Sequence, residues 1–157
     1  MKPRLLISFA LFALLSAQTH AQTPPPKLDS SLINFFVGAW SGEGHFSNGK
    51  PIAATLSFHL ALDSAWLVSE HRDRPPGDYK ADSYWGPDVA LVFDNFHGHR
   101  SFSSSWNGTK LVLATAYEHF IYEKVSPTQF RMTYEVSRDG TTWYLGDTLL
   151  FSRRAGG

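Results

Sequence analysis

Cysteine is absent from this chain of 157 residues. The fold therefore has no disulfide, no thiolate metal ligand and no cysteine nucleophile, and it must be held together by burial of apolar side chains. The length is that of one domain. Such a domain buries roughly two-thirds of the surface that its unfolded chain exposes, so it needs no covalent cross-link.

An excess of charge of either sign is also missing. The chain has 14 Lys and Arg against 14 Asp and Glu, which gives a formal net charge of zero. A nucleic-acid-binding protein needs a basic excess or a basic stripe to contact phosphates, so this class is not expected. With 43% hydrophobic and 18% charged residues the composition is that of an ordinary globular protein.

Long hydrophobic runs are missing as well. The run Leu5–Leu15 is much shorter than the roughly 20 residues that a membrane-spanning helix needs. Lys2 and Arg4 precede it, and small residues surround a cleavage site after Ala21. This pattern predicts a signal peptide over residues 1–21 and a periplasmic or secreted protein without a membrane span after cleavage; a retained N-terminal anchor is the alternative.

The chain also lacks the common local motifs of catalytic sites. The chain contains no G-x-S-x-G nucleophile motif, no phosphate-binding loop and no dinucleotide fingerprint. We therefore predict no cofactor from motifs. Any histidine–carboxylate pair has to be assembled by the fold.

What the chain does contain predicts a short helix followed by strands. Residues 22–28 form a Pro-rich spacer, and residues 29–157 form a single domain. Asp29 begins a helix with an apolar face. Turn signals then separate the expected strands: Val37–Phe46, Ile52–Leu62, Ala65–Arg74, Tyr79–Trp85, Val89–Phe96, Arg100–Trp106, Lys110–Val125 (two strands or one sharply bent strand), Gln129–Ser137 and Thr142–Ser152.

Consecutive strands joined by short turns predict the fold class. It is all-β: an antiparallel up-and-down β-barrel of about nine or ten strands with a short N-terminal helix. A two-sheet sandwich is the competing all-β architecture, but it usually has longer crossover connections. A barrel of about eight strands already holds side chains or one small ligand, so a larger one raises the question of a cavity.

Two motifs carry a resemblance to a known group of barrels. FFVGAWSGEG, Phe35–Gly44, resembles the opening of calycin-like barrels, namely the G-x-W of lipocalins and the longer G-x-W-x-G-x-G of nitrobindin-type proteins. SRDGTTWYLGDTLLFSR, Ser137–Arg153, is similar to the closing hairpin of an uncharacterised, often exported bacterial family. YWGPD, Tyr84–Asp88, matches a mid-chain motif of that family weakly. The resemblance implies a barrel that encloses a ligand.

The same resemblance raises the question of haem. Nitrobindin-type barrels hold haem iron through a histidine near the C-terminal end. Here the last histidine is His119, and Thr142–Arg153 contains none. The position of the family's ligand is therefore unmatched, and we do not predict haem.

The turn after Val89–Phe96 contains residues that could form a metal site. His97 and His99, with Asp94 nearby, are acceptable zinc ligands. A Gly between two histidines at a turn suits a solvated hairpin equally well. We do not predict a metal.

Five residues are candidate ligand contacts because they are large, amphipathic or charged and lie on predicted strands: Trp40, Trp66, Glu70, Trp106 and Tyr134. Two of them have purely structural alternatives. Trp40 can fill the end of the barrel, and Glu70 can form an exposed pair with Arg72 on one strand face. The direction of that face is left open, because both faces begin with apolar residues.

Three functional hypotheses follow. The first is an exported barrel that binds a small apolar or amphipathic molecule in its interior. The second is an enzyme in which His59, His71 or His119 works with Glu70 in acid–base chemistry on a lipophilic substrate. The third is an interaction module with a packed interior and an exposed apolar patch. The sequence predicts no oligomeric state.

Overall fold

The computed structural model describes residues 27–155, so the predicted signal peptide and most of the spacer lie outside it. A short helix is followed by ten strands: α1 (Ser30–Phe36), β1 (Gly38–Phe46), β2 (Pro51–Ala61), β3 (Trp66–Asp73), β4 (Lys80–Trp85), β5 (Val89–Asp94), β6 (Gly98–Trp106), β7 (Lys110–Ala114), β8 (Glu118–Ser126), β9 (Gln129–Ser137) and β10 (Trp143–Arg153). Within these residues no helix has the length and apolar character needed to cross a membrane.

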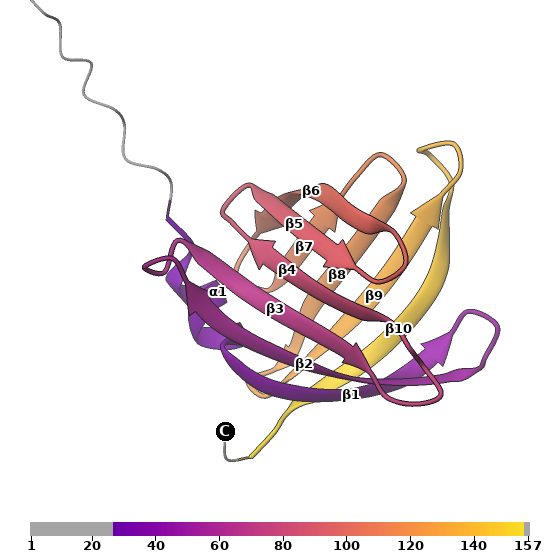
Figure 1. Cartoon of the computed structure of the whole chain (residues 1–157), viewed down its shortest axis with the longest axis horizontal. Helices are drawn as coiled ribbons and strands as arrows, with labels where there is room; N and C mark the ends of the chain where they lie inside the picture. Colours follow the sequence, from indigo (N-terminus) through magenta and orange to yellow (C-terminus); the bar gives the residue numbers. More distant parts are fainter. Residues whose placement is uncertain (1–26, 156–157) are drawn as a thin grey trace, which may run out of the picture.

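The ten strands form one closed antiparallel barrel (Figure 1). Each strand pairs with its neighbours along the chain, and β1 pairs with β10 to close the wall. The predicted up-and-down barrel with a short N-terminal helix is confirmed, and the sandwich alternative is wrong. The segment Lys110–Val125 is two strands, β7 and β8, separated by a turn.

Inward and outward residues alternate along each strand, as the pleat of a half-buried strand requires. On β2 the side chains of Ala54, Leu56 and Phe58 are buried. The pattern ends at the β2–β3 turn, where Leu62 is 71% exposed and has a positive φ of 51°. The predicted strand Ile52–Leu62 therefore stops one residue early, at Ala61.

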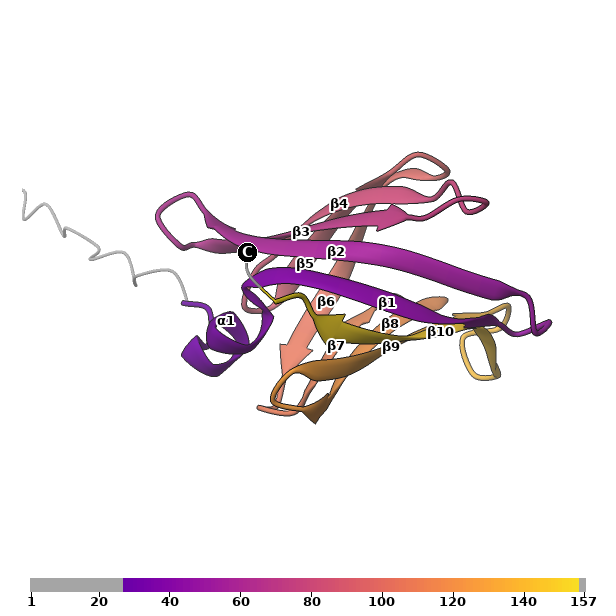
Figure 2. The same ribbon diagram turned by 90° about the horizontal axis from the view of Figure 1, so that it is seen from below.

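Helix α1 lies across one end of the barrel (Figure 2). Asp29 caps it, because its carboxylate accepts a hydrogen bond of 2.7 Å from the backbone N–H of Ser31. Three apolar residues of the helix, Leu32, Phe35 and Phe36, are buried. A helix of seven residues is not stable alone, so this burial holds it in place.

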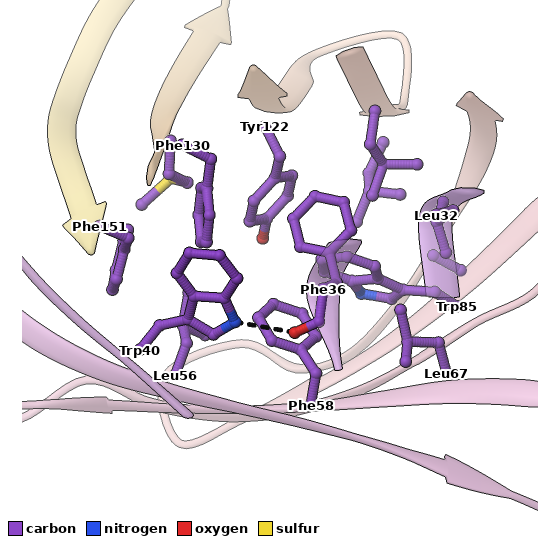
Figure 3. Packing of buried hydrophobic residues seen from close by; sticks show 14 of the residues in the cluster. Leu32, Phe36, Trp40, Leu56, Phe58, Leu67, Trp85, Tyr122, Phe130 and Phe151 are labelled. Carbon is purple, nitrogen blue, oxygen red and sulfur yellow. Dashed lines mark hydrogen bonds between the residues drawn. The ribbon is translucent and has the colours of Figure 1, made fainter. Parts of the chain in front are cut away.

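Aromatic rings fill that end of the barrel. Phe36 is fully buried, and its ring lies within 6.2 Å of four inward-facing rings, those of Phe58, Trp85, Tyr122 and Phe130. The indole Nε1 of Trp40 donates a hydrogen bond of 2.7 Å to the backbone oxygen of Phe36 (Figure 3). We call Phe36, Trp40 and these four rings the floor cluster.

Arg153 joins the last strand to the floor cluster. Its guanidinium lies 4.2 Å from the centre of the Trp40 ring, at cation–π distance. The same group donates hydrogen bonds to the backbone oxygens of Val37, at 2.7 Å, and of Phe35. Arg153 thus satisfies carbonyl groups at the C-terminal end of α1, which an isolated helix end would leave unpaired.

Replacing Phe36 by Ala should destabilise the protein by about 3–5 kcal/mol, because the substitution leaves a void among rings that cannot move into it. The matched control is Phe93→Ala, since Phe93 is 46% exposed on the outside of β5. Urea unfolding of both variants measures the difference. Equal losses would contradict the role of the floor cluster.

Candidate ligand-binding cavity

The barrel is hollow at the end opposite α1. A cavity of about 1100 Å³ opens there between the β1–β2, β3–β4 and β5–β6 turns, an opening that we call the mouth. Its wall includes six inward apolar residues: Ile52, Ala81, Val92, Leu113, Phe120 and Met132. The floor cluster separates this cavity from α1.

One polar group in the cavity is built around Arg100 on β6. Its guanidinium binds two carboxylates, Asp94 Oδ2 at 2.5 Å and Glu118 Oε1. Tyr134 donates a hydrogen bond of 2.7 Å to the same Glu118 oxygen. Arg100 is only 15% exposed, so the two carboxylates balance a charge that burial would otherwise penalise.

The protonation states of this group follow from its contacts. Burial raises the pKa of Asp94, but hydrogen bonds from the backbone N–H groups of His97 and Phe96, together with the Arg100 guanidinium, outweigh it and lower the pKa below its ordinary value. Burial and the hydrogen bond to Glu118 raise the pKa of Tyr134. Tyr134 therefore stays a neutral hydrogen-bond donor.

A second polar group consists of His71, Asp73 and Asp147. The Nε2 atom of His71 lies 2.9 Å from Asp73 Oδ1, and these side chains are 13% and 5% exposed. Asp147, on β10, has no comparable partner: its Oδ1 atom is buried without any hydrogen bond among the described residues. Burial, together with the charge of Asp73, raises the pKa of Asp147 to about 7.

A β-bulge at Gly146 directs Asp147 into the barrel. Leu145 pairs with Glu135 and Asp147 pairs with Tyr134, so one extra residue of β10 lies between two consecutive positions of β9. The bulge reverses the alternation: Leu145 is 45% exposed, whereas Asp147 lines the cavity. A Cβ atom at Gly146 would lie 2.7 Å from the Tyr134 ring, so the bulge needs glycine.

One of the five predicted contact residues, Tyr134, lines the cavity. Two others belong to the opposite end. Trp40 is part of the floor cluster, in agreement with the alternative that it fills the end of the barrel. Trp106 donates a hydrogen bond of 2.9 Å to Ser31 Oγ on α1. Both indoles have their N–H groups paired within the protein.

The remaining two, Trp66 and Glu70, lie on the outer face of β3. Leu67 and Ser69 are buried on the inner face of this strand, so the alternate positions point outward. Glu70 accepts a hydrogen bond of 3.0 Å from Ser57 Oγ, and the Trp66 ring lies 6.5 Å from that of Tyr84. The face of β3 that contains Leu67 and Ser69 is therefore the one that points into the barrel.

The structure also separates the predicted histidines. His71 lines the cavity, but its carboxylate partner is Asp73 and not Glu70. His59 is exposed, and His119 stacks on Trp143 at 3.6 Å. The described residues contain no cluster of three or more metal-ligating side chains, at His97 and His99 or elsewhere.

Four residues of the two polar groups have no role in any of the sequence-based hypotheses: Asp73, Arg100, Glu118 and Asp147. For Asp147 the sequence did hold a signal. It has the same parity as Leu149 and Phe151, which are buried on the inner face of β10. A carboxylate that continues an apolar face marks either the end of the core or a functional position.

Comparisons with known proteins add little to this geometry. No known protein family has a model that matches the chain, and no curated protein matches it. Among solved structures, a redesigned β-barrel is 13% identical, with a TM-score of 0.48 over 82% of this chain and 99% of that chain. EF1p2_mFAP2b bound to DFHBI is 12% identical, with a TM-score of 0.40 over 78% and 96%.

Asp147 should make the protein less stable as the pH rises from about 4 to about 7. The folded protein holds a proton on Asp147 up to a pKa of about 7, whereas the unfolded chain releases it near 3.8. Each unit of this shift corresponds to about 1.4 kcal/mol. We therefore expect Asp147→Asn to be more stable than the wild type by a few kcal/mol above pH 7, with little difference below pH 4.

Chemical denaturation at a series of pH values measures this difference. Asp78→Asn is the matched control, because Asp78 is an exposed carboxylate in the β3–β4 turn. His71 and Asp73 are present in all three proteins, so the comparison isolates Asp147. A pH profile of Asp147→Asn parallel to that of the wild type would contradict the assignment.

Proposed function

We propose that this protein binds a small amphipathic molecule inside the barrel. The observation that carries the proposal is the cavity of about 1100 Å³, which has apolar walls and two polar groups. Ligand sites are concave, mostly apolar and supplied with a few fixed polar groups, with volumes of about 300–1,000 Å³. The cavity is slightly larger than the upper limit of this range.

The two parts of the cavity offer a ligand different interactions. Burial of an apolar surface against residues such as Val92 and Met132 contributes about 25 cal/mol per Å². Tyr134, His71 and Asp147 offer hydrogen bonds that fix the orientation of the ligand. A molecule with an apolar body and a polar head matches both parts.

We also propose that the protein acts outside the cytoplasm. Support comes from the sequence of residues 1–21 alone, with its basic start, short apolar run and small residues before the cleavage site. A periplasmic or secreted barrel of this kind would carry or buffer a poorly soluble molecule.

Val92→Trp tests binding in the cavity. Val92 is 4% exposed on the inner face of β5, whereas its neighbour Leu91 is 36% exposed on the outer face. The fluorescent probe N-phenyl-1-naphthylamine should bind the wild type and Leu91→Trp alike. Its affinity for Val92→Trp should fall by at least about tenfold, equivalent to about 1.4 kcal/mol, because the indole occupies the space of the ligand.

Circular dichroism establishes that both variants are folded, and Ala81→Phe provides a second inward substitution at the cavity wall. An equal loss of probe affinity in Leu91→Trp would place the probe on the outer surface. No binding by the wild type would remove the proposed function.

A second candidate function is acid–base catalysis on the bound molecule. The observation that favours it is the His71–Asp73 pair in the wall of the cavity, with Nε2 and Oδ1 at 2.9 Å. This candidate predicts that a molecule recovered from the purified protein is chemically converted by the wild type and not by His71→Asn. Mass spectrometry of the recovered molecule distinguishes conversion from simple carriage. The hypothesis of an interaction module needs a packed interior, which the cavity contradicts.

A further inference from the structure

The charges inside the cavity do not balance. Arg100 is bound by both Asp94 and Glu118, so this group has one carboxylate in excess. Asp73 has only His71, which carries a charge only when protonated. Asp147 Oδ1 has no hydrogen-bond partner among residues 27–155. Among these buried side chains carboxylates therefore outnumber cations; the other Lys and Arg residues that line the cavity are exposed, namely Lys50, Arg74 and Arg131.

This excess is concentrated at Asp147 and Asp73. The two carboxylates are close enough for the charge of Asp73 to oppose ionisation of Asp147. No Lys or Arg of the described residues makes an ion pair with either one. A buried charge without a partner is costly, and a cation beside it removes much of that cost.

The bulge at Gly146 shows that the position of Asp147 depends on specific local structure. Without the extra residue, the register that pairs Leu145 with Glu135 would turn residue 147 outward. The glycine that permits the bulge leaves the Tyr134 ring in place beside it. The fold thus directs a carboxylate without a partner into a hollow with apolar walls.

We propose that the ligand carries a protonated amine, and that Asp147, supported by Asp73, binds this amine inside the cavity. This inference rests on the proposed function and deepens it. The apolar body of the ligand packs on the wall that includes Val92 and Met132, and the ammonium donates hydrogen bonds to the carboxylate of Asp147. An anionic head group is the competing chemistry, because Arg100 Nε is also buried without a partner.

The charges around Arg100 disfavour an anionic head group. Both terminal nitrogens of Arg100 are bound to carboxylates, so an anion at Nε would lie beside Asp94 and Glu118. Repulsion by two carboxylates opposes such binding.

Three fluorescent probes of one shape test the proposal: dansylcadaverine with a cationic amine, N-pentyl dansylamide with no charge, and dansyl-aminohexanoate with a carboxylate. Binding is measured by fluorescence titration at pH 8 and about 0.15 M salt, where exposed charges are largely screened beyond about 8 Å. The proteins are the wild type, Asp147→Asn, and Asp63→Asn as a control, because Asp63 is an exposed carboxylate in the β2–β3 turn, outside the cavity lining.

The wild type and Asp63→Asn should bind the cationic probe at least about tenfold more tightly than the neutral one, a difference of about 1.4 kcal/mol. Asp147→Asn should bind the cationic and neutral probes equally. The inference is overturned if the wild type shows no preference, prefers the anionic probe, or keeps its preference for the cation after Asp147→Asn.

These outcomes separate the inference from the proposed function. Binding of the neutral probe without any charge preference overturns the amine and leaves cavity binding in place. Failure of all three probes to bind overturns both.

Discussion

The width of a closed sheet of ten strands is the constraint on which the rest of the structure depends. A barrel of this size encloses more space than its inward side chains occupy. At one end α1 and the floor cluster fill that space, and Trp40, Phe36 and Arg153 connect the helix to the first and last strands. At the other end the described residues leave a cavity of about 1100 Å³.

The two ends therefore separate the residues that stabilise the fold from the residues of the proposed binding site. The floor cluster supplies apolar burial and paired polar groups, which is how a chain without cysteine holds its fold. The open end contains Asp147, whose burial reduces stability near neutral pH, and a bulge that directs it inward. Sites that bind ligands commonly keep such unfavourable groups, because the ligand provides the missing interaction.

The barrel could be predicted from the sequence because alternation and turn residues act locally. Asn48-Gly49 and Asp139-Gly140 fix two hairpins, and the helix is marked by Asp29. The site could not be predicted as well, for identifiable reasons. Both faces of β3 begin with apolar residues, so Glu70 and Asp73 could not be assigned to the outside and the inside. The bulge at Gly146 reverses the alternation of inward and outward side chains on β10. Gly146 is needed there because the Tyr134 ring of β9 packs against it, and this contact is known only once the strands are paired.

A crystal structure of the protein with dansylcadaverine tests the central claim most directly, namely that the open end of the barrel holds a ligand. The account predicts electron density for the dansyl ring among Val92, Leu113 and Met132, with the amine within hydrogen-bonding distance of Asp147. A barrel whose mouth turns fold inward to fill the cavity, or a probe bound only to the outer face beside Trp66, would contradict it.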